Sequence, residues 1–133
     1  MFVMLNPSTA TEAQNDPTIE RCERRARALG FGGFMATNIF AWRDTDPAGL
    51  RKAIEPVGSA NDAIVLQGAG WADLTIAAWG VHGLFLDRGT EVETLLRGSG
   101  HALFHLGLTK AGLPRHPLYV AYARQPELWL PTR

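Results

Sequence analysis

Cysteine is almost absent from this sequence of 133 residues, with Cys22 as its single example. One thiol excludes a disulfide within the chain and also a metal site built from several thiolates. A reducing compartment fits this usage best, so we expect a cytoplasmic protein. Disulfides are not needed for stability either, because a domain of this length can bury roughly two thirds of the surface that its unfolded chain exposes.

The sequence also lacks a long hydrophobic run and an excess of charge of either sign. The apolar residues 1–5 end at Asn6-Pro7, too early for a signal peptide or a membrane span, so no membrane partner is expected. The formal net charge of zero argues against a protein that holds duplex nucleic acid mainly by neutralising phosphates. Residues 101–133 are nevertheless basic, and this end either meets an anion or is a solvated terminus that lacks acids.

Several motifs that carry chemistry are missing. There is no Gly-x-Ser-x-Gly elbow, no glycine-rich phosphate loop and no Cys-x-x-Cys pair, so serine-hydrolase, P-loop and thiol-redox functions have little support. His101 and His105 are four residues apart, but their segment has the pattern of a strand and contains no Glu between them. We therefore expect neither a metal site nor a cofactor.

The sequence does contain an alternation of short apolar runs and amphipathic segments, without internal repeats or linkers. Strands are predicted where an apolar run stops at turn-forming residues: 1–5, 34–40, 74–79 and 102–106. Helices are predicted between them at residues 17–29, 47–54, 59–66 and 90–96. Near the end, Trp129 and Leu130 are expected to dock on the sheet or on a second subunit, and the sequence does not set the oligomeric state.

The helix starts are predicted from capping residues. Asp16 before Pro17, and Asp46 before the next proline, each combine a side-chain acceptor with a residue that needs no N–H donor. Ser59 and Asp62 have the spacing of a capping box. Away from its apolar face the first helix carries arginines, most simply interpreted as a solvated face: Arg21, Arg24, Arg25 and Arg27.

Alternating strands and helices predict a single α/β domain over residues 1–133. The expected architecture is a three-layer αβα sandwich with a central four-stranded, mainly parallel sheet in the order 2-1-3-4. Ligands of such sheets bind outside the carboxyl ends of the strands, where the strand order reverses. The loops that begin at Asn6, Asn38, Gly80 and Gly107 should all belong to that edge.

Polar residues follow the first two predicted strands. The carboxamide of Asn6 and the hydroxyls of Ser8 and Thr9 could orient a water molecule or bind a small polar ligand, although this segment could equally be an ordinary turn. Asn38 interrupts an apolar strand, and an unpaired buried carboxamide costs roughly 1–3 kcal/mol. Its partner should therefore be either a ligand, such as the edge of a pyrimidine base, or a neighbouring loop.

Three further candidates lie in loops at the same edge. Trp42 could stack on a base or pack in the core, and Arg43 could hold a phosphate. Arg115 and His116 place a cation beside an imidazole that could donate a hydrogen bond to developing negative charge, or could simply face solvent. His82 is a weaker candidate.

Several of these segments resemble the signatures of a bacterial family with a domain of unknown function, number sixteen-forty-three: Leu5-Asn6-Pro7-Ser8-Thr9-Ala10, Asp16-Pro17-Thr18, Thr37-Asn38-Ile39-Phe40-Ala41, Ala78-Trp79-Gly80 and His116-Pro117-Leu118-Tyr119. More remotely, their order is similar to that of motifs in the uracil-DNA glycosylase superfamily. This resemblance implies the fold of that superfamily. It also implies that Asn6 orients the attacking water, Asn38 reads the base and His116 stabilises the departing base.

The sequence departs from the glycosylase pattern in two motifs. No aspartate stands beside Asn6, and the last motif continues with Leu118 instead of serine. Together with the neutral charge, these differences point to a small nucleotide or a modified base as ligand. The resemblance implies that relatives carry a segment before the first strand, so a truncated or misassigned start would leave that edge of the sheet poorly covered.

The leading hypothesis is a hydrolase of an N-glycosidic bond in a nucleic acid or nucleoside. The alternative is a non-catalytic domain that binds a nucleobase, a nucleotide or a nucleic-acid end in the same cleft through Ser8, Asn38, Arg43 and Arg115. A protein-interaction domain with a vestigial cleft is a third hypothesis, which a large exposed apolar patch would favour.

Overall fold

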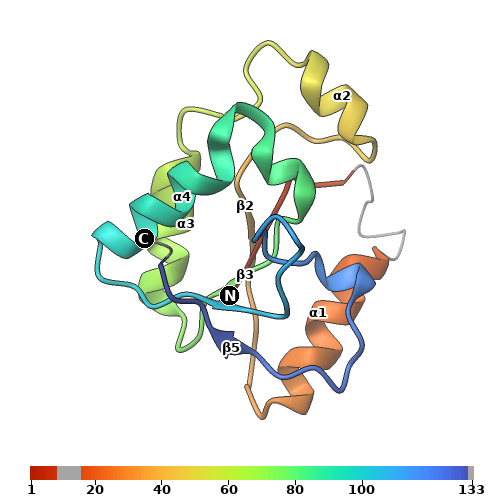
Figure 1. Ribbon diagram of the computed structural model, residues 1–133, viewed down its shortest axis with the longest axis vertical. Helices are drawn as coiled ribbons and strands as arrows, with labels where there is room; N and C mark the ends of the chain where they lie inside the picture. Colours follow the sequence, from red (N-terminus) through yellow and green to blue (C-terminus); the bar gives the residue numbers. More distant parts are fainter. Residues whose placement is uncertain (9–15, 132–133) are drawn as a thin grey trace.

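A computed structural model of the protein describes residues 1–8 and 16–131 (Figure 1). Within these residues five strands form one sheet in the order β2-β1-β3-β4-β5. The first four strands run parallel, and β5 pairs antiparallel with β4. The strands are β1 (Phe2–Met4), β2 (Ala36–Asn38), β3 (Ile76–Ala77), β4 (Phe104–His105) and β5 (Glu127–Leu128).

Among the described residues, four α-helices and two short 3-10 helices connect these strands, which confirms the predicted mixed α/β class. The α-helices are α1 (Pro17–Ala28), α2 (Pro47–Lys52), α3 (Asn61–Trp71) and α4 (Arg88–Gly98), and the 3-10 helices are η1 (Val81–Asp87) and η2 (Pro117–Tyr119). In the part of the chain that the structure describes, no helix has both the length and the apolar character that crossing a bilayer requires.

Helices cover both faces of the sheet, with α1 on one side and α3 and α4 on the other (Figure 1). The side chains of β1 alternate between the two layers, as the period of a strand requires. Phe2 and Met4 pack with Cys22 of α1, whereas Val3 packs with Val65 of α3 and with residues of α4. The two apolar layers therefore lie on opposite faces of a sheet that is buried on both sides.

The prediction of four strands is wrong because β5 was missed. This strand has only two residues, both exposed, so it has no apolar run that could reveal it. It forms through long-range contacts of the next residue. The N–H of Trp129 donates to the carbonyl of Leu103 at 2.7 Å, and its indole packs against Trp79 with a centroid separation of 5.8 Å. Trp129 therefore docks on the sheet, which is one of the two positions that the sequence predicted for it.

The cap of α1 forms as predicted, and the cap of α3 does not. The Asp16 side chain accepts hydrogen bonds from the N–H groups of Thr18 and Ile19. At α3 the cap position is Ala60, without a side-chain hydrogen bond, so the capping box predicted from Ser59 and Asp62 is wrong. The helix also continues to Trp71, five residues beyond its predicted end.

The side chains at the starts of α3 and α4 bind the end of β2 instead. Asn61 donates from Nδ2 to the carbonyls of Asn38 at 2.8 Å and Ile39 at 2.9 Å. Arg88 is only 1% exposed and donates from Nε to the same Ile39 carbonyl at 2.7 Å. The remaining Arg88 nitrogens pair with Asp62 and Glu91. The end of β2 is thus held from two helices on one face of the sheet.

The interpretation of the α1 arginines as a solvated face is wrong for two of the four. Arg24 and Arg27 do form exposed pairs with Glu20 and Glu23, one turn earlier. Arg21 and Arg25 instead reach across to the segment 117–124, where they donate to main-chain carbonyl groups: those of Pro117, Val120, Ala121 and Arg124. The guanidinium of Arg21 also stacks 4.4 Å from the ring centroid of Tyr122. These contacts attach the chain after η2 to α1.

Replacing the buried arginine is expected to destabilise the fold. Arg88→Met removes a charged donor from the carbonyl of Ile39, so we expect the free energy of unfolding to fall by about 2–3 kcal/mol. Urea denaturation followed by circular dichroism measures this loss. Arg24→Met is the matched control, because its exposed pair with Glu20 contributes about 0.5 kcal/mol or less. Equal losses in the two variants would show that Arg88 does not anchor β2.

Candidate functional site

A cleft of about 1270 Å³ opens at the carboxyl edge of the parallel strands, beside the first turns of α1. Its lining comes from the loops after four successive strands. Asn6 follows β1, Asn38 ends β2, Gly80 follows β3 and His116 comes from the segment after β4. The structure thus brings together the three residues on which the sequence-based hypothesis depends.

Asn38 lines this cleft, and no described residue pairs with its carboxamide. It is opposite Met4 in the register of β1 and β2, and Met4 packs in the layer of α1. The side chain is half-buried, yet it makes no hydrogen bond with any residue of the described ranges 1–8 and 16–131. The expectation that another loop pairs with this amide is therefore not met. Its acceptor and its two donors remain available to a ligand.

Asn6 is engaged on one side of its amide. Its Nδ2 donates to the carbonyls of Trp42 and Asp44, both at 3.0 Å, with a longer contact of 3.4 Å to the carbonyl of Pro7. These bonds tie the loop after β1 to the loop after β2. In the described part of the chain, Oδ1 has no hydrogen-bond donor. Asn6 can therefore accept a hydrogen bond from a ligand or a water molecule through Oδ1.

His116 offers a single donor. It caps η2, where its Nδ1 accepts a hydrogen bond of 3.3 Å from the N–H of Leu118, so a neutral ring carries its proton on Nε2. Burial lowers the pKa of His116, and the negative charge of Asp16 opposes this shift. The ring is therefore neutral near pH 7. Gly80 packs against it with φ of 73°, and a Cβ there would lie 3.4 Å from the His116 Cβ.

Asp16 was considered only as a helix cap in the sequence, but it also lines the cleft. Its Oδ1 accepts from Thr18 and Ile19, and its Oδ2 accepts a 2.8 Å hydrogen bond from the hydroxyl of Ser8. Ser8 lines the cleft as well. The capping role fully accounted for an aspartate before Pro17, so only its place in the motif Asp16-Pro17-Thr18 could have indicated a second role.

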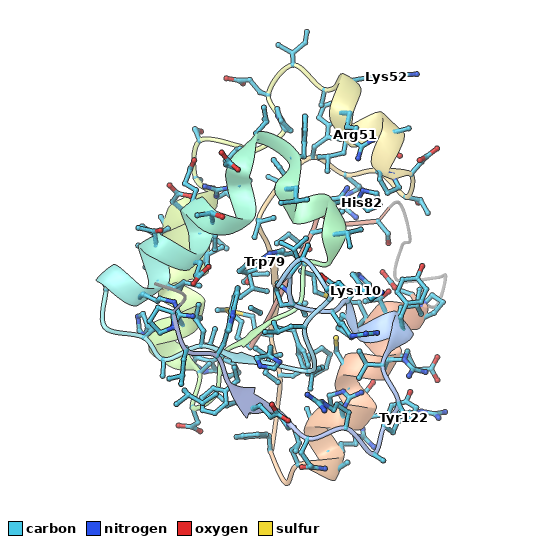
Figure 2. All side chains as sticks on the ribbon, in the orientation of Figure 1. Arg51, Lys52, Trp79, His82, Lys110 and Tyr122 are labelled. Atoms are coloured by element: carbon cyan, nitrogen blue, oxygen red, sulfur yellow. The ribbon has the colours of Figure 1, made fainter. Side chains whose placement is uncertain are left out.

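Two predicted cations line the cleft and differ in their engagement. Arg43 donates from Nη1 to the carbonyl of Ser8 at 2.9 Å. The exposed side chain of Arg115 makes no hydrogen bond or ion pair within the described residues. His82 also lines the cleft, and its Nδ1 lies 3.4 Å from Nη2 of Arg51 (Figure 2).

Trp42 and His105 do not line the cleft. The indole of Trp42 is 44% exposed and does not line the cleft, so neither core packing nor stacking in the cleft describes it. Thr9 lies outside the described residues. His105 is buried, where its Nδ1 accepts from the N–H of Gly107 at 2.9 Å. Among the residues that the structure describes, no three His, Cys, Asp or Glu side chains are grouped so that they could hold a metal ion.

Comparison with known proteins places these motifs in one family. The family described as Protein of unknown function (DUF1643) matches residues 1–118. The chain belongs to this family. The cleft-lining residues from Asn6 to His116 fall inside the matched region, and Tyr119, the last residue of the His116-Pro117-Leu118-Tyr119 segment, lies one residue beyond it. None of the curated proteins and none of the solved structures matches the chain.

The two asparagines of the DUF1643 cleft should differ in their effect on stability. Asn6→Ala removes the donors that hold two loops together, so we expect a loss of about 1–3 kcal/mol in the free energy of unfolding. Asn38→Ala removes an amide that has no partner among the described residues and should change the free energy of unfolding by less than about 0.5 kcal/mol. Urea denaturation measures both. A loss for Asn38→Ala as large as that for Asn6→Ala would reveal a structural partner of Asn38.

His116 should titrate below its ordinary pKa of 6.5 because it is buried, and so should His105 for the same reason. The unfolded chain then takes up these protons at a higher pH than the folded protein does. Stability therefore falls as the pH is lowered from about 7 through this window. NMR titration of the imidazole signals gives the midpoints, with the urea-unfolded protein as the reference. A His116 midpoint at or above that reference would contradict the structure.

Proposed function

We propose that this DUF1643 protein hydrolyses an N-glycosidic bond while the nucleobase is bound in the cleft. The observation that carries the proposal is the Asn38 carboxamide, half-buried at a strand end and unpaired within the described residues. Its acceptor and donors lie in one plane, an arrangement that matches the hydrogen-bonding edge of a pyrimidine base. A bound base would supply the hydrogen-bond partners that the described residues do not provide to Asn38.

The neutral imidazole supports a catalytic role. When the glycosidic bond breaks, its electron pair leaves on the base, which becomes negatively charged. The Nε2–H of His116 could donate to that developing charge, and a neutral donor keeps its proton throughout the step. Burial, which lowers the pKa of His116, favours this form of the ring. His116 is therefore assigned to the departing base.

Asn6 is assigned to the attacking water. Its Oδ1 accepts no hydrogen bond from the described residues, and its orientation is fixed by the two carbonyls that hold Nδ2. A water molecule that donates to Oδ1 would be oriented for attack on the anomeric carbon of the sugar. The order of these motifs along the chain, similar to that of the uracil-DNA glycosylase superfamily, also supports the proposal, and we infer a common fold from it.

Binding without turnover is the second candidate. The absence of a carboxylate next to Asn6 in the sequence favours it, since neither Leu5 nor Pro7 can take the proton of the attacking water. Under this alternative, Asn38 and Ser8 contact the base or sugar of a nucleotide. Arg43 and Arg115 contact its phosphate. Both functions use the same cleft, so only the release of a base separates them.

The assay is base release from nucleosides, nucleotides and oligonucleotides that carry normal, deaminated or modified bases, measured by chromatography and by alkali-labile sites. We expect release of one class of base, and a fall in kcat of about 100-fold or more in His116→Gln. Gln67→Ala, on the exposed face of α3, is the matched control and should retain full activity.

If no base is released while nucleotides raise the thermal midpoint of the wild type but not of Asn38→Ala, the glycosylase proposal is wrong and the binding alternative holds. If no nucleotide or base has any effect on the midpoint, the cleft does not bind nucleobases at all.

A further inference from the structure

The charge of the cleft limits the kind of nucleotide that it can take. Four carboxylates line it, from Asp16, Glu20, Glu23 and Asp44, against the guanidiniums of Arg43 and Arg115. The exposed pairs of Glu20 with Arg24 and Glu23 with Arg27 offset two of these negative charges. Counted over the described residues, the cleft is therefore neutral to acidic and is not a cationic groove.

A nucleic-acid strand needs more positive charge than this. Proteins that hold nucleic acid neutralise many phosphates, roughly 6–10 in tight complexes, each with a lysine or arginine. Most other arginines of the described chain are already engaged internally. Arg21, Arg25 and Arg88 donate to carbonyl groups, and Arg24, Arg27 and Arg97 pair with glutamates.

Of the two arginines that line the cleft, Arg115 is not engaged in this way. The side chain of Arg115 lines the cleft without a hydrogen bond or ion pair to any described residue, whereas the side chain of Arg43 donates to the carbonyl of Ser8. A single available guanidinium suits a single phosphate group, which it can bind with two parallel N–H donors.

The sheet sets the distance between this cation and the base site. The N–H of Arg115 donates to the carbonyl of Gly107 beyond β4 at 2.9 Å, and a Cβ on that glycine would lie 3.1 Å from Cδ of Arg115. Asn38 ends β2, and β1 and β3 lie between β2 and β4. Three strand spacings amount to roughly 14 Å. This is the separation of the main chains, and the two side chains extend into it, so the span leaves room for a mononucleotide between the carboxamide and the guanidinium.

We propose that the substrate is a free nucleoside monophosphate, with its base at Asn38 and its phosphate at Arg115, and not a base within a nucleic-acid strand. This assignment rests on the proposed function. The carboxylates of Asp16, Glu20 and Glu23, which form the α1 wall of the cleft, can accept hydrogen bonds from the sugar hydroxyls, but they repel the further phosphates that a strand would bring. The wall thus selects against a polymer.

The reaction is a balanced hydrolysis. The oxygen of water bonds to the anomeric carbon, and the bond from that carbon to the base nitrogen breaks. The electron pair leaves with the base, which takes up the proton that the water gives up. The products are a free base and a sugar phosphate, and no oxidant, reductant or second substrate is required.

The test compares one reactive base in four contexts: the nucleoside, its 5′-monophosphate, a single-stranded oligonucleotide and a duplex. We expect kcat/KM for the monophosphate to exceed the other three by about tenfold or more. The logarithmic slope of its binding constant against salt should be shallow, because a free monophosphate has no condensed counterions to release, as a strand does. Calorimetry between low and moderate salt measures this slope.

Arg115→Gln should reduce the preference for the monophosphate over the nucleoside to about one. Lys110→Gln is the matched control, because this lysine lies in the same segment between β4 and η2 but does not line the cleft, and it should keep the preference (Figure 2). Circular dichroism shows whether each variant is folded. An unchanged preference in Arg115→Gln would overturn the phosphate site.

The results also separate this inference from the proposed function. Release of the base from a strand at an equal or higher kcat/KM overturns the inference and leaves the glycosylase proposal standing. Arg115-dependent binding of the monophosphate without base release supports the mononucleotide site and refutes the glycosylase. If none of the four compounds binds, both are refuted.

Discussion

The position of Asn38 depends on two side chains that hold the main chain of β2 from the opposite face of the sheet. Asn61 and the buried Arg88 donate to the carbonyls of Asn38 and Ile39. A carbonyl left without a donor at a buried strand end costs about 1–3 kcal/mol. Because the main chain is satisfied from the side of α3 and α4, the Asn38 side chain need not turn back to cap its own strand. It stays available on the side of the cleft.

Local sequence patterns predicted those elements that local interactions define. The apolar run before Asn6 and the cap of Asp16 are signals within a few residues, and both lead to the observed structure. The strand β5 has no such signal, because it exists through the hydrogen bond between Trp129 and Leu103. The spacing of a capping box was present at Asp62, but that carboxylate is used in a tertiary ion pair. Contacts between distant segments decided both cases.

The candidate site was likewise predictable from the sequence only in part. That Asn6, Asn38 and His116 would share one edge followed from the topology, since the carboxyl ends of parallel strands meet there. The topology did not predict which polar atoms would remain without a hydrogen-bond partner. The amide donors of Asn6 are used by carbonyls more than thirty residues away, while the Asn38 amide meets no partner in the described chain. Hydrogen-bond occupancy depends on loop geometry, which no residue pattern encodes.

The attachment of the last part of the chain to α1 has a consequence for how sequences in this region can diverge. Arg21 and Arg25 hold the stretch after η2 by its main-chain carbonyls, and every amino acid carries that group. Such recognition does not discriminate between side chains. Beyond residue 118, where the family match ends, residues such as Ala121 and Arg124 can therefore be exchanged while the two arginines keep their carbonyl partners, whereas Tyr122 and Trp129 are also held through their side chains.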